Sequence, residues 1–364
     1  MATIKDVAKL AGVGLGTASR AISGRGPVSE KALAKVNDAV AALDFRPSNI
    51  ARALSTKTLG MIGVYVPDFS GTFYGPILQT VDRELRAVER HMVAANGTGP
   101  GDAREQALEG IRFLNERQCD GVLVMSNDLT EADFAGLFAR HPNLVVLNRH
   151  TRAKASLSFS TDHELGGRLA ARALLARGHR EIALVSGPHS APDNEQRMAG
   201  FLDELARHRV RVPRRRQSVG DFSFDSGYAA VEALLAAGPR DYTALFCAND
   251  VMAMAAMSCL HKLGVSMPGE LSVLGFDDSE IARYTAPRLT TVQVPIVEAA
   301  ASACRHLLNQ CYGLNLTVSR DFAPRIVWRD SLGAGPHPQQ PELAANTGAT
   351  PTSPTRAQPS RKTR

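Results

Sequence analysis

The stretch "AGVGLGTASRAISG", residues 11–24, places Gly12, Gly14 and Gly16 within five positions. This spacing suits either a dinucleotide-binding loop, in which G-x-G-x-x-G follows a strand, or a turn between two helices. The last glycine of such a loop would stand at position 17, which is a threonine. The preceding "TIKDVAKLA" has helical periodicity, with Thr3 and Asp6 spaced as a capping box. We therefore expect Gly12 to end one helix and Gly14 to precede the next.

The second helix, expected from Leu15 to about Ile22, has two different faces. Its inner face is small and apolar and suits packing on the first helix; it consists of Ala18, Ala21 and Ile22. Its outer face is small, hydroxyl-bearing and cationic; it consists of Leu15, Gly16, Ser19 and Arg20. This layout is typical of a helix-turn-helix whose second helix enters the major groove of DNA. An ordinary helical hairpin remains the alternative at this point.

The charge distribution favours a polyanionic partner for the first part of the chain. Residues 1–60 hold nine basic side chains, namely Lys5, Lys9, Arg20, Arg25, Lys31, Lys35, Arg46, Arg52 and Lys57. The same stretch holds four acidic ones, namely Asp6, Glu30, Asp38 and Asp44. The whole chain of 364 residues has a net charge of +6, so the remainder is nearly neutral. The basic run "RHRVRVPRRR" at 207–216 is interpreted as a solvated loop.

Neither cysteine nor histidine spacing indicates a metal site or a cofactor. The five cysteines lack C-x-x-C spacing, and the ten histidines form no H-E-x-x-H pattern. No signal-peptide pattern begins the chain, and no apolar run approaches the length of a membrane span. We expect a soluble cytoplasmic protein with reduced cysteines, no metal and no membrane partner.

Beyond residue 59 the pattern changes to apolar, strand-length runs that alternate with amphipathic helices. The runs include "LGMIGVYV", "GVLVM", "LVVLN", "EIALVSG", "ALFCAN" and "LSVLGF". Such alternation predicts an α/β fold with parallel sheets covered on both faces, and its length predicts two doubly wound subdomains. We divide the chain into a helix-turn-helix domain (1–45), a hinge helix and linker (46–58), a two-lobed core (59–332) and a disordered, Pro/Gly/Thr-rich tail (333–364).

Polar residues follow the predicted strands, where ligands of open parallel sheets bind. They include Asp68, Asn148, Phe222, Asn249, Asp250, Asp277 and Asp278, together with Arg197 and Phe73 at helix starts. Carboxylates, amides, a guanidinium and aromatic rings suit a sugar. Helix capping is an equally good explanation for Asp250 and Asp278. Catalysis is disfavoured, because Asp277 and Asp278 are adjacent and point to opposite sides, and no nucleophile elbow or P-loop is present.

An ordered set of motifs resembles the LacI–GalR family of bacterial transcriptional regulators. It includes "TIKDVAKLAGV", "TASRAISG", "RPSNIARALSTKT", "RGHREIALVSG", "RMAGF", "ANDVMAMAAM" and "LSVLGFDDSEIARYTAPRLTTV", between residue 3 and about residue 332. Several segments look closest to the galactose and β-glucoside repressors of that family. The resemblance implies a homodimer that binds operator DNA and is released by a sugar inducer. It also implies a hinge helix and a core like that of periplasmic sugar-binding proteins.

The resemblance also implies roles for individual residues. The positions that match DNA contacts are Leu15, Gly16, Thr17, Ser19, Arg20, Ser48, Ala51 and Leu54, with Leu54 as a minor-groove wedge. The positions that match effector contacts are Phe73, Asn148, Arg197, Phe222, Asn249 and Asp277, with Asp68 added. The family usually has serine at position 14 and a bulkier polar residue at position 16, so the operator sequence does not follow from relatives.

Two other functions remain open from the sequence. In a purine-type regulator the ligand promotes DNA binding, and Phe73 and Phe222 could hold a base between them. A periplasmic sugar-binding transport protein is the other, and the basic first domain argues against it. Neither the effector, the operator nor the regulated genes follow from the sequence.

Overall fold

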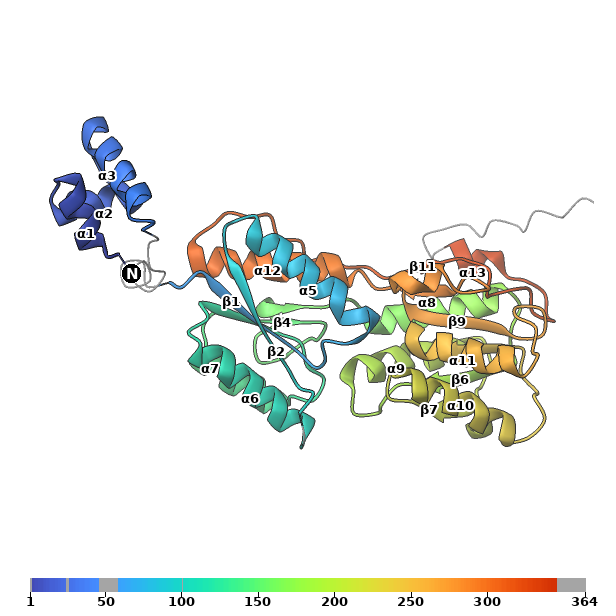
Figure 1. The fold of residues 1–364 in the computed structure, drawn as a ribbon. Helices are drawn as coiled ribbons and strands as arrows, with labels where there is room; N and C mark the ends of the chain where they lie inside the picture. The colour runs from blue at the N-terminus through green and yellow to red at the C-terminus, as the bar shows by residue number, and fades with distance from the viewer. Residues whose placement is uncertain (1, 24–25, 46–57, 100, 346–364) are drawn as a thin grey trace, which may run out of the picture. The chain divides into compact units, whose positions relative to one another are not determined.

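The computed structural model describes residues 2–23, 26–45, 58–99 and 101–345 (Figure 1). The chain divides into two compact units, Met1–Met61 and Ile62–Arg364. Each unit has a hydrophobic core of its own. Residues 46–57 lie outside the described residues, and with them the predicted hinge helix and the positions Ser48, Ala51 and Leu54. No helix in the described part of the chain is long and apolar enough to cross a membrane.

The first unit consists of three helices, α1 (Ile4–Ala11), α2 (Leu15–Ser23) and α3 (Glu30–Ala42). The predicted capping box is present, because Thr3 and Asp6 each accept a hydrogen bond from the other's backbone N–H group. Gly12 has φ 63° and donates its N–H group to carbonyl oxygens at the end of α1. This left-handed conformation is one that glycine adopts without strain. The expectation that Gly12 ends the first helix is therefore confirmed.

The two faces of α2 are divided as the sequence predicts. Ala18 is buried in a core whose other fully buried members are Val7, Ala8, Ala11, Val36 and Ala39. On the opposite face Leu15 is 48% exposed, and Gly16, Ser19 and Arg20 are exposed as well. A Cβ atom built on Gly16 meets nothing within 4 Å, so space remains for a side chain there. The three-helix part of the first unit, which we call the headpiece, thus exposes this side of α2 to solvent.

The second unit begins with a five-stranded sheet in the order β2-β1-β3-β4-β5. Its strands are β1 (Met61–Val66), β2 (His91–Asn96), β3 (Gly121–Val124), β4 (Leu144–Leu147) and β5 (Ser158–Phe159). Strands β1, β3, β4 and β5 are joined in parallel. Its helices are α5 (Gly71–Arg86), α6 (Ala103–Glu116) and α7 (Glu131–Arg140). The apolar runs form these strands because both faces of the sheet are covered (Figure 1).

A six-stranded sheet follows, in the order β11-β10-β9-β8-β6-β7. Its strands are β6 (Ile182–Ser186), β7 (Gln217–Val219), β8 (Ala244–Cys247), β9 (Ser272–Asp277), β10 (Thr290–Gln293) and β11 (Arg325–Val327). The helices are α8 (His163–Ala176), which packs beside α9 (Pro192–Arg207), and α10 (Phe224–Ala236), which packs beside α11 (Asp250–Lys262). All pairings are parallel except β10 with the edge strand β11. The predicted parallel architecture is therefore confirmed, with this one antiparallel addition.

The chain crosses between the two sheets three times. After β10 it returns to the first sheet as α12 (Ile296–Tyr312), which packs against α5, β3 and β4, and then comes back as β11. Arg320 on the last crossing donates to the Ser158 carbonyl at 2.8 Å, and its guanidinium lies 3.7 Å from the centre of the Phe159 ring. The Thr161 hydroxyl on the first crossing donates to the Phe322 carbonyl. We call the part of the second unit built on the five-stranded sheet the first lobe, and the part built on the six-stranded sheet the second lobe. These contacts hold two of the crossings together where the two lobes meet.

Residues 333–345 pack on the second unit, so the predicted disorder from residue 333 onward is wrong for this segment. The end of α8 leaves carbonyl oxygens without partners inside the helix. Backbone N–H groups of the segment donate to carbonyls there, from Gly335 to Arg177 at 2.7 Å, from His337 to Gly178 at 3.2 Å and from Gln340 to Ala176 at 3.0 Å. Leu343 on α13 (Pro341–Ala345) packs against the core. The segment has too few apolar residues to fold alone, but it is ordered by docking.

We predict opposite effects for alanine at two of the headpiece glycines. Gly12→Ala should destabilise the headpiece by about 1 kcal/mol, because alanine is strained at φ 63°. Gly16→Ala should stabilise it by a few tenths of a kcal/mol, because glycine loses more backbone entropy than alanine on entering the first turn of α2. Hydrogen exchange of the α1 and α2 amides measures both changes. Equal protection of the amides from exchange in the Gly12→Ala variant and in the unchanged protein would contradict the role of Gly12 as the left-handed residue that ends α1.

We predict that α13 contributes to the stability of the second unit. Leu343→Ala should lower the free energy of unfolding by about 1 kcal/mol, because a partly buried side chain is lost from the core. Glu342→Ala, on the same helix but exposed, is the control and should leave stability unchanged. Thermal unfolding of the full chain is the measurement. Indistinguishable melting temperatures for Leu343→Ala and Glu342→Ala would argue against docking of this segment.

Candidate functional site

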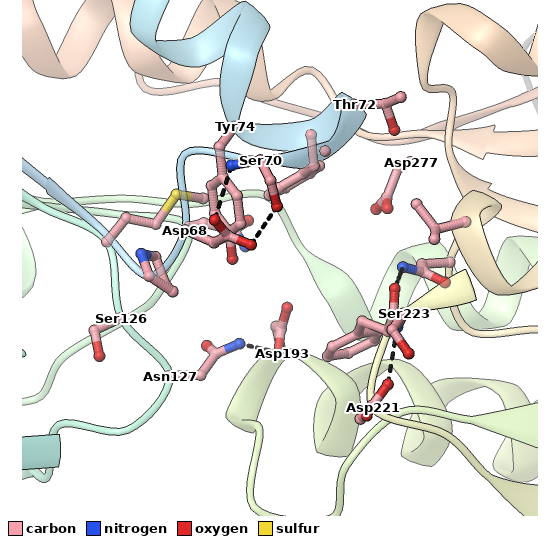
Figure 2. A pocket seen from close by; sticks show the side chains of 18 of the residues that line it. Asp68, Ser70, Thr72, Tyr74, Ser126, Asn127, Asp193, Asp221, Ser223 and Asp277 are labelled. Carbon is pink, nitrogen blue, oxygen red and sulfur yellow. Dashed lines mark hydrogen bonds between the residues drawn. The ribbon is translucent and has the colours of Figure 1, made fainter. Parts of the chain in front are cut away.

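A cavity of about 450 Å³ lies at the carboxyl ends of strands from both sheets (Figure 2). All seven side chains expected to contact an effector line it, namely Asp68, Phe73, Asn148, Arg197, Phe222, Asn249 and Asp277. Figure 2 shows Asp68, Tyr74 and Asn127 on one side and Asp221 and Asp277 on the other. Asp68, Asn148, Phe222, Asn249 and Asp277 come together because they lie at the carboxyl ends of parallel strands, which meet at one edge of a sheet. Phe73 and Arg197 reach the same cavity from helices α5 and α9.

Arg197 is the buried cation of this site. It lies on α9 and is 2% exposed. One terminal nitrogen donates to the Ala248 carbonyl, and the other lies 3.7 Å from an Asp193 carboxylate oxygen. Its guanidinium also lies 3.8 Å from the centre of the Phe276 ring. Burial of a guanidinium is tolerated when it is paired in this way. Its Nε atom has no hydrogen-bond partner among the described residues.

Asp193 connects Arg197 to the opposite lobe. Its carboxylate accepts a hydrogen bond from the Asn127 side chain at 3.0 Å (Figure 2). The same oxygen accepts from the Asn194 backbone at 2.9 Å. Asn127 follows β3 of the first sheet, whereas Asp193 and Arg197 lie on α9, which belongs to the second. This contact therefore spans the two lobes inside the cavity.

Asn148 is joined to the same cluster through a histidine. Its side-chain oxygen lies 3.1 Å from Nε2 of His163, which is 2% exposed at the start of α8. Nδ1 of His163 lies 3.4 Å from a terminal nitrogen of Arg197. Burial, together with the neighbouring Arg197, lowers the pKa of His163 to about 4. His163 is therefore neutral at pH 7.

Two residues in left-handed backbone conformations form the wall contributed by the second lobe. Phe222 has φ 73° and Asp277 has φ 119°. The Asn249 side chain caps α11 by accepting from the Met252 N–H group, and it donates to the Phe222 carbonyl at 3.0 Å. A Cβ atom on Gly187 would lie 2.4 Å from the Phe222 ring. The absence of a side chain at position 187 therefore leaves room for this ring.

The carboxylates of the cavity differ in the hydrogen bonds that they accept from the protein. Asp68 accepts hydrogen bonds from the backbone and side chain of Ser70, which lower its pKa. Asp221 likewise accepts from the Ser223 backbone (Figure 2). Burial raises the pKa of Asp277 well above its usual range, and Arg197 opposes this shift. In the described structure the Asp277 carboxylate receives no side-chain hydrogen bond, so it is open to a ligand.

Asp250 and Asp278 lie outside the cavity lining and have structural contacts. Asp250 accepts from the Thr291 hydroxyl at 2.6 Å and from the Ser279 N–H group at 2.7 Å. Asp278 accepts from Gln293 at 2.9 Å and pairs with Arg329. Helix α11 is capped by Asn249, so neither aspartate caps a helix with its side chain. Both instead accept hydrogen bonds from side chains of strand β10.

The structure adds lining residues that the sequence analysis did not select. They include Ser126, Asn127, Asp193 and Asp221. Ser126 and Asn127 follow the run "GVLVM", so the strand-end rule could have found them. Asp193 and Arg197 are four residues apart on one helix face, which is a weaker signal. No cluster of potential metal ligands occurs among the described residues.

The headpiece residues expected to contact DNA lie together on α2. Leu15, Gly16, Ser19 and Arg20 are exposed, and Thr17 is partly buried. Figure 1 shows α2 with α1 and α3 in the first unit. The exposed positions share one side of a short helix that is held by the core through Ala18. This is the geometry that a recognition helix needs.

Comparison with known proteins identifies the family. A family model described as "Bacterial regulatory proteins, lacI family" matches residues 3–48. A second, described as "Periplasmic binding protein-like domain", matches residues 171–332. The chain is 34% identical to the HTH-type transcriptional regulator GalR of Escherichia coli K12, over 96% of this chain and 99% of that protein. The chain belongs to the lacI family of bacterial regulatory proteins.

Two solved structures of the family extend the comparison. A transcriptional regulator of the LacI family from Burkholderia phymatum shares 47% identity with a TM-score of 0.72, over 75% of this chain and 99% of that one. The Lac repressor dimer bound to operator and the anti-inducer ONPF shares 27% identity with a TM-score of 0.81, over 92% and 99%. The family and the two-lobed fold expected from the motifs are thus confirmed, and these relatives are transcriptional regulators.

Proposed function

We propose that this protein is a sequence-specific DNA-binding repressor that a sugar releases from its operator. The observation that carries the proposal is the convergence of seven expected effector residues on one cavity. In this proposal residues 1–45 bind DNA, 46–58 link the two units, and 59–332 bind the effector and form a homodimer. A C2 dimer presents two headpieces to a pseudopalindromic operator. The proposal assigns no catalytic role and a cytoplasmic location.

The lining of the cavity supports a polyhydroxylated ligand. Carboxylate and amide groups pair with adjacent hydroxyls, and the rings of Phe73, Phe222 and Phe224 provide apolar surface for C–H faces. Within the described lining, carboxylates outnumber guanidinium groups, with Asp68, Asp193, Asp221 and Asp277 against Arg197. Arg197 is already paired with Asp193, and hydrogen bonds lower the pKa of Asp68 and of Asp221. These two charged carboxylates leave the cavity with an excess of negative charge, which disfavours phosphorylated or acidic sugars. We infer that the effector is uncharged.

Contacts between the lobes provide a route for the effector to act. The bonds from Asn127 to Asp193 and from His163 to Asn148 both join the first lobe to the second. The first lies between two lining residues, and the second holds the lining residue Asn148 from behind. A ligand that binds among these groups favours one arrangement of the lobes. It changes DNA affinity only by the difference between its affinities for the DNA-bound and free states. In our proposal the free state binds the sugar more tightly.

We predict that Arg20 contributes to base recognition. Arg20→Ala should weaken operator binding by about 1–3 kcal/mol and relax base preference, because arginine pairs bidentately with guanine. Lys9→Ala on α1 is the control and should weaken binding to all sequences about equally. Fluorescence anisotropy with a selected operator and a scrambled duplex compares them. Unchanged preference in Arg20→Ala would remove this residue from the groove.

We predict that Asp277 is required for induction and not for DNA binding. Asp277→Asn should abolish the response to sugar and leave operator affinity near that of the unchanged protein, because the carboxylate accepts hydrogen bonds from ligand hydroxyls. Asp225→Asn, which is exposed and outside the cavity lining, is the control and should respond normally. Operator release is followed by anisotropy during sugar titration. Ordinary release of Asp277→Asn, or tighter DNA binding with a purine, would contradict the proposal.

A further inference from the structure

We propose that His163 is a positioning residue that sets the orientation of the Asn148 amide and so makes the cavity a hydrogen-bond donor at that point. The inference deepens the proposed function, since it concerns recognition of the same effector. His163 is not itself part of the cavity lining. It acts through Asn148, which is 6% exposed and lines the cavity.

The direction of the hydrogen bonds follows from the chemistry of arginine. A guanidinium has only donors, so the contact between Arg197 and Nδ1 of His163 requires Nδ1 to be the acceptor. In a neutral imidazole with an unprotonated Nδ1, the proton resides on Nε2. Nε2–H then donates to the Asn148 oxygen at 3.1 Å. The side-chain NH2 group of Asn148 is left, and it has no hydrogen-bond acceptor among the described residues.

Both ends of this chain of hydrogen bonds are anchored. Arg197 is held by the Ala248 carbonyl, by Asp193 and by the Phe276 ring, so its guanidinium cannot rotate away from His163. The His163 ring is also stacked on Phe276, at 6.3 Å between ring centres. At the other end, the backbone N–H group of Asn148 donates to the Phe159 carbonyl at 2.8 Å. The amide is therefore fixed in place, and His163 decides which of its two ends faces the cavity.

The consequence is a constraint on the ligand. Donation runs in one direction, from Arg197 to His163 and from His163 to Asn148, and it ends in an amide N–H group beside the cavity. The effector must offer an acceptor there, such as a hydroxyl or ring oxygen of a sugar. This series of hydrogen bonds also runs from the second lobe to the first. A ligand that accepts a hydrogen bond from Asn148 is therefore coupled to the contact between the lobes.

The tautomer of His163 is measured on the full-length protein without any ligand. Two-bond ¹H–¹⁵N correlation spectra of protein labelled at histidine distinguish protonation at Nδ1 from protonation at Nε2. The signal is assigned by its disappearance in His163→Gln. We expect a neutral ring protonated at Nε2 at pH 7. A ring protonated at Nδ1, or at both nitrogens, would overturn the proposal.

Two variants of His163 then test the effect on binding. His163→Gln retains one donor and one acceptor, whereas His163→Leu removes both. The probe is the tightest-binding sugar among D-galactose, D-glucose, methyl β-D-glucoside and cellobiose, measured by calorimetry. His163→Leu should bind it about tenfold more weakly, since an oriented hydrogen bond is lost, and His163→Gln within about threefold of the unchanged protein. Thermal unfolding and operator affinity show that both variants are folded.

The outcomes separate this inference from the proposed function. If His163→Leu binds the sugar as tightly as the unchanged protein, the positioning role is wrong while the sugar-binding function stands. If instead both variants bind the sugar equally weakly, binding does not depend on the hydrogen bonds that His163→Gln retains, and the positioning role is wrong as well. If the unchanged protein binds none of the four sugars, the proposed function is in question, and the tautomer measurement still decides the role of His163.

Discussion

The buried guanidinium of Arg197 is the constraint on which the cavity between the two sheets depends. A cation that is 2% exposed must be compensated by charge and hydrogen bonds from its surroundings. Asp193 provides the charge, the Ala248 carbonyl provides an acceptor, and Phe276 provides a ring face. Each of these groups comes from a different part of the second lobe. The contacts of this one side chain therefore hold α9 against the end of β8 and the end of β9.

The same pairing organises the contact between the lobes. Asp193 is held by Arg197 and accepts from Asn127 of the first lobe, while His163 joins Arg197 to Asn148. Two inter-lobe hydrogen bonds thus converge on one cation. In the proposed function this arrangement suits regulation, because a ligand in the cavity would contact the groups that join the lobes.

The headpiece depends on local backbone geometry instead. Gly12 ends α1 in a left-handed conformation, the Gly14 carbonyl accepts the first hydrogen bonds of α2, and Gly16 leaves the exposed side of α2 thin. The glycines that raised the possibility of a nucleotide loop are thus part of a helical turn. In the proposed function, a helix-turn-helix with little bulk on its outer side leaves base contacts to Leu15 and Arg20.

Local patterns in the sequence determined much of this protein. The capping box at Thr3, the end of α1 at Gly12, the two sides of α2 and the alternating strands and helices all involve hydrogen bonds and periodicities over a few residues. The strand-end rule also placed five residues in one cavity, namely Asp68, Asn148, Phe222, Asn249 and Asp277, because the edge of a parallel sheet is set by chain direction. The motifs supplied the family.

Only the tertiary structure decided the partners of those residues. Residues 333–345 are ordered because their backbone N–H groups donate to carbonyl oxygens that the end of α8 leaves without partners. The composition of the segment does not reveal this. Asp193 and His163 acquire their roles through Asn127 and Asn148, which follow strands of the other lobe. The environment that lowers the pKa of His163 is created by burial between elements far apart in sequence. Periodicity encodes which face of an element is buried, whereas the groups it meets there depend on how distant segments pack.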